Sequence, residues 1–94
     1  MKRRKLGLWG KSFSLGRIVV VSASLKSRPP SEITDALVRH NLGDWGDVTE
    51  RRRQVNDKSV WKKRSLRSIY SSKNGIRFHI VTNADRSLTK VQAF

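Results

Sequence analysis

The sequence predicts an α+β fold with an N-terminal strand, one or two short helices, and then a three-strand antiparallel β-meander packed on the helices. A β-branched run lies near the N-terminus, and apolar residues recur at helical spacing in the segment that follows. Apolar and polar residues then alternate beyond Lys58, which is typical of strands. In a chain of 94 residues, we expect one domain over residues 13–94, preceded by a flexible basic arm over residues 1–12.

The first strand is predicted by the β-branched run at residues 18–21. Gly16 precedes the run, and small residues follow it. An uninterrupted run between such residues is typical of a buried strand. We therefore expect this strand to lie inside the domain.

Residues 26–43, with the sequence KSRPPSEITDALVRHNLG, predict a helix. The two prolines fit only in a first turn, and the acidic residues that follow favour the positive end of the helix dipole. Gly43 suits the end of the helix. One stripe with i, i+3, i+4, i+7 spacing comprises Ile33, Ala36, Leu37 and His40.

A tight turn and a second short helix are expected next. Gly43 and Gly46 permit a sharp backbone path around Trp45, whose indole is expected to fill the gap between helix and sheet. We assign these three residues structural roles. Residues 49–57 then predict a short helix in which Thr49 is the N-cap.

Residues 66–72 and 76–82 predict a hairpin. Asn74 and Gly75 lie between them and favour a two-residue type I′ turn, which needs positive φ at both positions. Across such a turn the opposed pairs are Ile69 with Ile80, Tyr70 with His79 and Ser71 with Phe78. The predicted core face comprises Ile69, Ile76, Phe78 and Ile80, and the other face comprises Tyr70, Arg77, His79 and Val81.

The third strand of the meander is expected over residues 89–94. A register that places Val91 beside Ile80 and Ala93 beside Phe78 keeps apolar side chains on the core face. A slip by one residue would bring polar side chains there instead.

Composition excludes several classes of site. Without cysteine, neither disulfides nor thiolate zinc sites can form, and His40 and His79 alone cannot complete a structural zinc site. We expect no metal and no cofactor. No run of about 18 apolar residues is present, and the basic start lacks the apolar segment of a signal peptide. We therefore expect a cytoplasmic protein without membrane association.

The net charge of +14 is the strongest bulk feature of the sequence. Basic residues dominate both ends of the chain, and most of the acids lie in residues 32–57. Self-repulsion on this scale opposes folding, so an anionic partner is the economical explanation. We expect that partner to be nucleic acid or the acidic protein surface of a host complex. The sequence leaves the oligomeric state open.

Three basic clusters, two of them with a tryptophan nearby, are the predicted binding residues. A tryptophan beside basic side chains can stack on bases or insert into a partner. The clusters comprise Lys2, Arg3, Arg4, Lys5 and Trp9; Arg51, Arg52 and Arg53; and Trp61, Lys62, Lys63, Arg64 and Arg67. No groove-reading motif is visible, so phosphate contacts with little sequence preference are expected.

Three sequence blocks resemble those of a family of small proteins carried by plasmids, integrative elements and prophages, often labelled plasmid-related proteins. The blocks are RHNLGDWG (residues 39–46), SIYSSKNG (68–75) and IVTNADRSLT (80–89). The resemblance covers roughly residues 13–91 and includes Asn56, which resembles a recurring asparagine. It implies an origin in a mobile genetic element and brings no assigned activity.

Two groups of residues raise the question of catalysis or ligand binding. Asp85, with the polar residues around it, forms either a braced corner or a phosphate site, and the bracing role is the stronger interpretation because Asp bonds to its own backbone in turns. The other group would suit a small basic ribonuclease of the toxin type, with proton transfer and phosphate stabilisation. It comprises Tyr70, Arg77, His79 and Arg86.

Our leading hypothesis is a non-enzymatic basic binding protein of a mobile element. It would engage nucleic acid or a host complex that binds nucleic acid, and inhibition of a host defence system is one form of that function. The alternatives are the ribonuclease and a structural RNA-binding protein.

Overall fold

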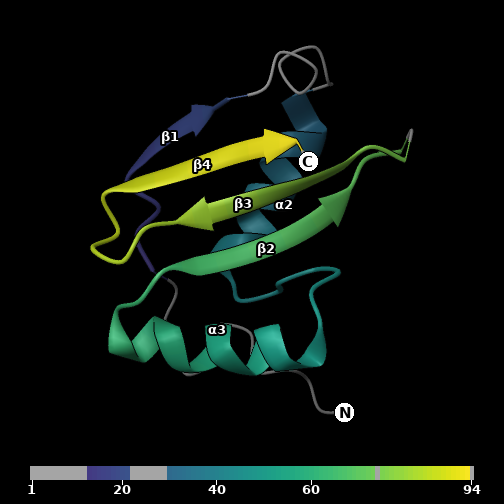
Figure 1. The fold of residues 1–94 in the computed structure, drawn as a ribbon. Coiled ribbons are helices and arrows are strands. Elements are labelled where there is room, and N and C mark those ends of the chain that lie inside the picture. Colours follow the sequence, from purple (N-terminus) through teal and green to yellow (C-terminus); the bar gives the residue numbers. More distant parts are fainter. Residues whose placement is uncertain (1–12, 22–29, 74, 94) are drawn as a thin grey trace.

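The computed structural model describes residues 13–21, 30–73 and 75–93, in which two helices accompany a four-stranded sheet (Figure 1). The predicted α+β class is confirmed. The basic arm predicted at residues 1–12 lies outside the described residues. The elements, in chain order, are β1 (Arg17–Val20), α2 (Pro30–Asn41), α3 (Glu50–Lys62), β2 (Leu66–Ser71), β3 (Arg77–Thr82) and β4 (Leu88–Ala93).

The sheet is mixed, with the strand order β1-β4-β3-β2. The three C-terminal strands form the predicted antiparallel meander, and β1 pairs in parallel with β4. Two parallel strands need a long crossover connection, and here the chain between β1 and β4, which includes both helices and the other two strands, forms it. The prediction of a meander was therefore correct for three strands and incomplete for the whole sheet.

Strand β1 is an edge strand, so the prediction that it is buried was wrong. Ile18 and Val21 are each 45% exposed. Only Val20 of this strand packs against the core. A β-branched run indicates strand conformation, but it does not reveal whether one neighbour or two will cover the strand.

The register of β3 against β4 is as predicted, with Val91 opposite Ile80 and Ala93 opposite Phe78. The register of β2 against β3 is one residue away from the prediction. Ser68 lies opposite Ile80, Ile69 opposite His79 and Tyr70 opposite Phe78.

The loop of this hairpin explains the shift. The Ser72 N–H donates to the Ile76 carbonyl at 2.9 Å, so three residues separate this bonded pair, and one of them, Asn74, lies outside the described residues. Gly75 has a φ of 81°, and its N–H donates to the Ser72 carbonyl at 3.0 Å. This is the geometry of a three-residue hairpin loop ending in a left-handed glycine. One extra loop residue exchanges the faces of β2, so Tyr70 lies in the core and Ile69 does not.

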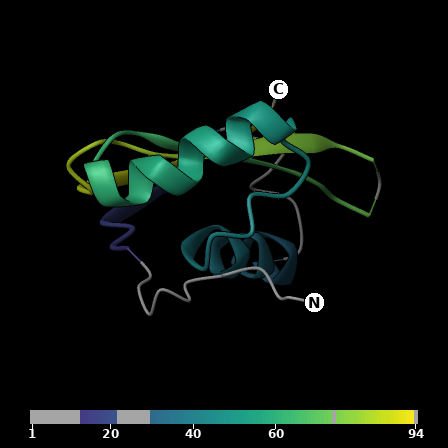
Figure 2. The same ribbon diagram turned by 90° about the horizontal axis from the view of Figure 1, so that it is seen from below.

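Helix α2 covers one face of the sheet, and α3 runs along the outer edge of β2 (Figure 2). The core between α2 and the sheet comprises Ala36, Tyr70, Phe78, Ile80 and Val91, with Ile33 and Leu37 packed against it. Ile33, Ala36 and Leu37 belong to the predicted helical stripe. Its fourth member, His40, is fully buried.

Helix α3 is attached to the edge of β2 by polar contacts. Its fully buried residues are Asn56 and Ser59. The Asn56 side chain donates to the Arg67 carbonyl at 2.7 Å and accepts from the Arg67 N–H at 3.3 Å, as a neighbouring strand would. The backbone of residues 45–47 does the same for Ile69, with bonds of 2.7 and 3.1 Å. At Arg67 and Ile69, the backbone N–H and C=O groups on the outer edge of β2 therefore have hydrogen-bond partners.

We expect Asn56→Asp to lower the free energy of unfolding by about 2 to 3 kcal/mol, because a carboxylate cannot donate to the Arg67 carbonyl and would be buried there. Urea unfolding at pH 7.5 measures the change. Gln54→Glu, an exposed amide-to-acid change on the same helix, is the control and should cost no more than about 0.5 kcal/mol. Equal losses in the two variants would contradict the role given to Asn56.

Candidate nucleic-acid interface

A chain of hydrogen bonds around His40 runs through the interior. The Nδ1 atom of His40 lies 2.5 Å from the Ser68 Oγ, and its Nε2 lies 2.9 Å from the Thr82 Oγ1. Thr82 bonds to Thr89 at 2.8 Å, and Thr89 donates to the Leu15 carbonyl at 2.6 Å. The chain therefore links α2 to β2, β3, β4 and the segment before β1.

His40 is neutral and enclosed by rings. Phe13 and Trp45 lie against its imidazole, with centroids 5.3 and 5.5 Å away. Burial, together with the charge of Arg86, lowers the pKa of His40 to about 3. The Ser68–His40 contact has the composition of a nucleophile–base pair, yet both side chains are at 0% exposure. Because no substrate reaches them, we assign this group to the fold.

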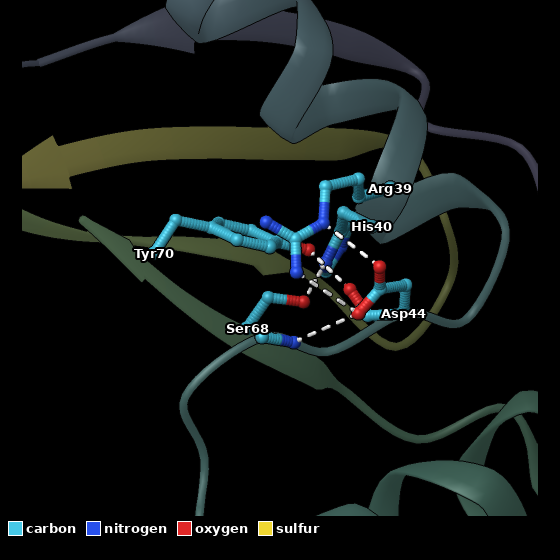
Figure 3. Close-up of polar contacts among 6 residues, drawn as sticks. Arg39, His40, Asp44, Ser68 and Tyr70 are labelled. Atoms are coloured by element: carbon cyan, nitrogen blue, oxygen red, sulfur yellow. Dashed lines mark hydrogen bonds and ion pairs between the residues drawn. The ribbon is translucent and has the colours of Figure 1, made fainter. Parts of the chain in front are cut away.

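Arg39, Asp44 and Tyr70 form a second polar group, at the end of α2 (Figure 3). Arg39 donates to both carboxylate oxygens of Asp44, at 2.8 and 3.1 Å, and its guanidinium lies 4.8 Å from the centroid of the Tyr70 ring. The Tyr70 hydroxyl donates to the Asp44 carbonyl at 2.6 Å. Burial raises the pKa of Tyr70, so the phenol stays a neutral donor. These contacts fasten the end of α2 to β2.

The turn that these residues support also needs its glycines. Gly43 and Gly46 have φ values of 84° and 74°, in the left-handed region. A Cβ atom on Gly46 would lie 2.0 Å from the Ile69 carbonyl oxygen, so no side chain fits there. Trp45 is 2% exposed, and its indole N–H donates to the Asp57 carboxylate at 2.9 Å. The structure thus places the predicted structural residues at the junction of α2, α3 and β2.

The corner between β3 and β4 is closed by its own side chains. The Asp85 Oδ1 accepts from the Ser87 N–H at 3.0 Å and from the Ser87 hydroxyl at 2.6 Å, and these bonds lower the pKa of Asp85. Asn83 accepts from the N–H groups of Ser87 and Leu88. These bonds agree with the interpretation of Asp85 as a brace.

Arg86 connects this corner to the C-terminal end of α3. Within the corner, the Arg86 guanidinium donates to the carbonyls of Asn83, at 3.1 Å, and Ala84, at 3.3 Å. It also donates to the carbonyls of Ser59, at 2.9 Å, and Arg64, at 2.6 Å. A cation at this end of a helix is stabilised by the helix dipole, and here it adds to the backbone N–H groups of the two residues after α3, which already donate to the Ser59 carbonyl. Arg86 therefore holds α3 in place.

The proposed ribonuclease group does not assemble. The observed register puts Tyr70 on the core face, whereas Arg77 and His79 lie on the opposite face of the sheet. Arg86 lies at the end of α3. The prediction that these residues share a site was wrong, for Tyr70 because the hairpin loop is one residue longer than assumed, and for Arg86 because its guanidinium bonds to the end of α3.

The face of the sheet opposite α2 is the candidate interface, and we call it the open face. Its charged residues are all cations and comprise Arg17, Arg67, Arg77 and Lys90, one from each strand. Paired residues of neighbouring strands point to the same side, which places all four cations on this face. The seven acids of the chain all lie outside the strands. No described helix covers this face, which is turned toward the viewer in Figure 1.

Between the cations, the open face carries apolar side chains and one ring. Ile69 and Val81 are partly exposed, and His79 lies between Ile69 and Gln92 in one row across the sheet. Partial burial and the nearby charge of Arg67 lower the pKa of His79. The imidazole is therefore neutral at pH 7, and the positive charge of the face comes from the arginines and the lysine.

The predicted binding residues divide between two surfaces. Arg67 lies on the open face, whereas Arg51, Arg52, Arg53, Trp61 and Lys62 lie on α3, with Lys63 and Arg64 just after it. Lys2, Arg3, Arg4, Lys5 and Trp9 fall outside the described residues. Arg53 pairs with Glu50 on the same helix. Trp61 is 55% exposed.

Arg17 and Lys90 were missed as binding residues. The predicted binding residues lie in or near runs of neighbouring cations in the sequence, and Arg17 and Lys90 each stand alone in their strands. The predicted register of β3 against β4 already placed Lys90 opposite Val81, whereas the alignment of Val81 with Arg67 depends on the register of β2 against β3, which the prediction missed. Arg17 joins them through a parallel pairing that the sequence did not predict.

Among the described residues, no group of three or more His, Asp or Glu side chains is placed to hold a metal ion. Within the same ranges, no helix has the length and apolar character needed to cross a membrane. No protein-family model, curated protein or solved structure matches the chain.

We expect the stability of the protein to fall as the pH drops from about 6.5 toward 5. The unfolded chain binds a proton on His40 near pH 6.5, and the folded protein binds it only near pH 3. The loss approaches about 1.4 kcal/mol per pH unit in that window, and carboxylates titrate mainly below it. Urea unfolding at pH 7.5 and 5.0 measures it.

His79→Gln is the control, because its lowered pKa acts in the same direction from a partly exposed site. It should remove little of the pH dependence, whereas His40→Gln should remove most. NMR of the unsubstituted protein adds a direct readout, in which the His40 ring stays neutral at pH 5. A His40 imidazole that titrates near pH 6.5 in the folded protein would disprove this explanation.

Proposed function

We propose that the protein is a non-enzymatic nucleic-acid-binding protein and that the open face is its binding surface. The observation that carries this proposal is the segregation of charge in the sheet. All four charged residues of the strands are cations on the face opposite α2, and the acids lie on helices, loops and the corner. A surface with a single sign of charge attracts a polyanion without competition from its own carboxylates.

The kind of binding follows from these groups. Arginine and lysine contact phosphate oxygens, which fix position and supply most of the affinity but carry no sequence information. Neither described helix projects from the open face to enter a groove. We therefore propose binding with little sequence preference and a steep dependence on salt. The resemblance of the sequence blocks supports a mobile-element setting, in which such a protein would occupy nucleic acid that a host system uses.

The outward side of α3 favours a second candidate function, which is docking to the acidic surface of a host protein complex. Trp61 and Val55 are 55% and 40% exposed there. Three cations, Arg51, Lys58 and Lys62, share that side at i, i+7 and i+11. An exposed tryptophan beside a row of cations suits a protein interface with an acidic partner. Inhibition of a host defence complex would be one use of such docking.

Two double variants with the same change in net charge test the first proposal. Arg77→Gln with Lys90→Gln alters the open face, and Lys58→Gln with Lys62→Gln alters α3. Affinity for a labelled oligonucleotide, measured by fluorescence anisotropy from 50 to 300 mM salt, should fall mainly in the first variant. Its log–log salt slope should also decrease by about 1.4 to 1.8, the value for two lost phosphate contacts. Equal losses in the two variants would show that bulk charge alone drives binding.

A pull-down from host lysate tests the second candidate, with each sample split into nuclease-treated and untreated halves. A defined protein partner that survives nuclease and is lost in Trp61→Ala supports docking through α3. Trp61 is exposed, so its removal should leave the fold intact, as a melting temperature confirms. Loss of every captured protein after nuclease would contradict this candidate.

A further inference from the structure

We infer that the open face takes single-stranded nucleic acid, with an unpaired base stacked on the ring of His79. This inference rests on the proposed function, because it requires that the open face binds nucleic acid. Beyond that function, the inference specifies single-stranded nucleic acid as the ligand and His79 as the residue that distinguishes single strands from duplexes.

His79 lies in the middle of the face, with cations on both sides of it. Along β3, Arg77 is two residues before it and Val81 two residues after, so each is about 7 Å away. Val81 lies in one row across the sheet with Lys90 and Arg67. A base on the imidazole would therefore have phosphate-binding groups on either side along the strand.

The width of the sheet excludes insertion into a duplex groove. Four strands spaced about 4.8 Å apart span about 14 Å between the outer strands, before side chains are added. The minor groove of B-DNA is about 6 Å wide and the major groove about 12 Å. A duplex could touch this face only through its phosphate ridges.

The apolar centre of the face needs a ligand with apolar surface. Ile69 and Val81 flank His79 across and along the sheet. A phosphate ridge would cover these side chains with charge, whereas the faces of unpaired bases are flat and apolar. Sheet faces that combine stacking rings with surrounding cations are suited to single strands. Gln92, opposite His79, adds an amide that can donate to or accept from the edge of a stacked base.

The test uses the full chain and three probes. They are a labelled 12-nucleotide single strand without self-complementarity, the same strand annealed to its complement, and polyphosphate as a competitor without bases. Anisotropy at fixed salt should show tighter binding of the single strand than of the duplex. RNA and DNA versions of the strand distinguish the two sources of the same chemistry.

Variants at position 79 identify the stacking residue. His79→Ala should weaken single-strand binding by at least about fivefold, the lower end of the effect of losing one stacked base, and should leave duplex binding unchanged. His79→Phe, which keeps a flat ring, should retain the affinity. Thr34→Ala, at an exposed position on α2, is the control and should change neither. Melting temperatures confirm that each variant is folded.

The outcomes separate this inference from the proposed function. Equal binding of single strand and duplex, with His79→Ala without effect, overturns the inference and leaves nucleic-acid binding intact. Equal loss of polyphosphate binding and single-strand binding in His79→Ala also overturns it, because the effect would then not involve bases. Absence of binding to either nucleic acid at 50 mM salt overturns both.

Discussion

The hydrogen bonds of one buried imidazole hold the parts of this fold together. Each ring nitrogen of His40 meets a hydroxyl, one on β2 and one on β3, and the second hydroxyl continues through Thr89 to the backbone of Leu15. Hydroxyl groups both donate and accept, so this chain is complete with a neutral ring. A charged ring in the same enclosure would carry an unpaired charge in the interior. The contact between α2 and the sheet therefore depends on His40 staying neutral.

The residues of the three sequence blocks meet around this imidazole. Arg39, Trp45 and Tyr70 surround the end of α2, and the residues of the third block supply two hydroxyls, the corner and the cap of α3. The blocks specify how the chain folds. The surfaces left for contact with a partner are the open face, with the cations of its strands, and the outward side of α3.

Most of the secondary structure followed from local patterns, because helix stops, caps and alternation act over a few residues. The helical stripe with Ala36 and His40 and the register of β3 against β4 could be predicted in this way. The side of the sheet on which Tyr70 lies could not be predicted. Asn74 and Gly75 are compatible with loops of two or three residues, and a difference of one residue in the loop exchanges the two faces of β2.

Long-range partners were beyond the reach of local patterns. The parallel partner of β1 lies some 70 residues away in the chain, and nothing near Arg17 indicates it. The predicted register of β3 against β4 placed His79 and the cations of these two strands on one face. Arg17 and Arg67 could not be added to that face without the pairing of β1 and the correct register of β2. Asn56 presented the same difficulty, because a polar residue in a basic helix gives no sign that it will pair with the backbone of Arg67.

The attachment of α3 has a consequence for how the molecule opens. Asn56, Trp45 and Arg86 hold this helix through a few directed hydrogen bonds, and little apolar area is buried beneath it. These hydrogen bonds define the position of α3 on the sheet. When α3 separates from β2 they break together, and little apolar surface becomes exposed to water. We therefore expect α3 to open at a lower free energy than the core under α2. Amide exchange along α3 would then proceed at a lower free energy than exchange in β3.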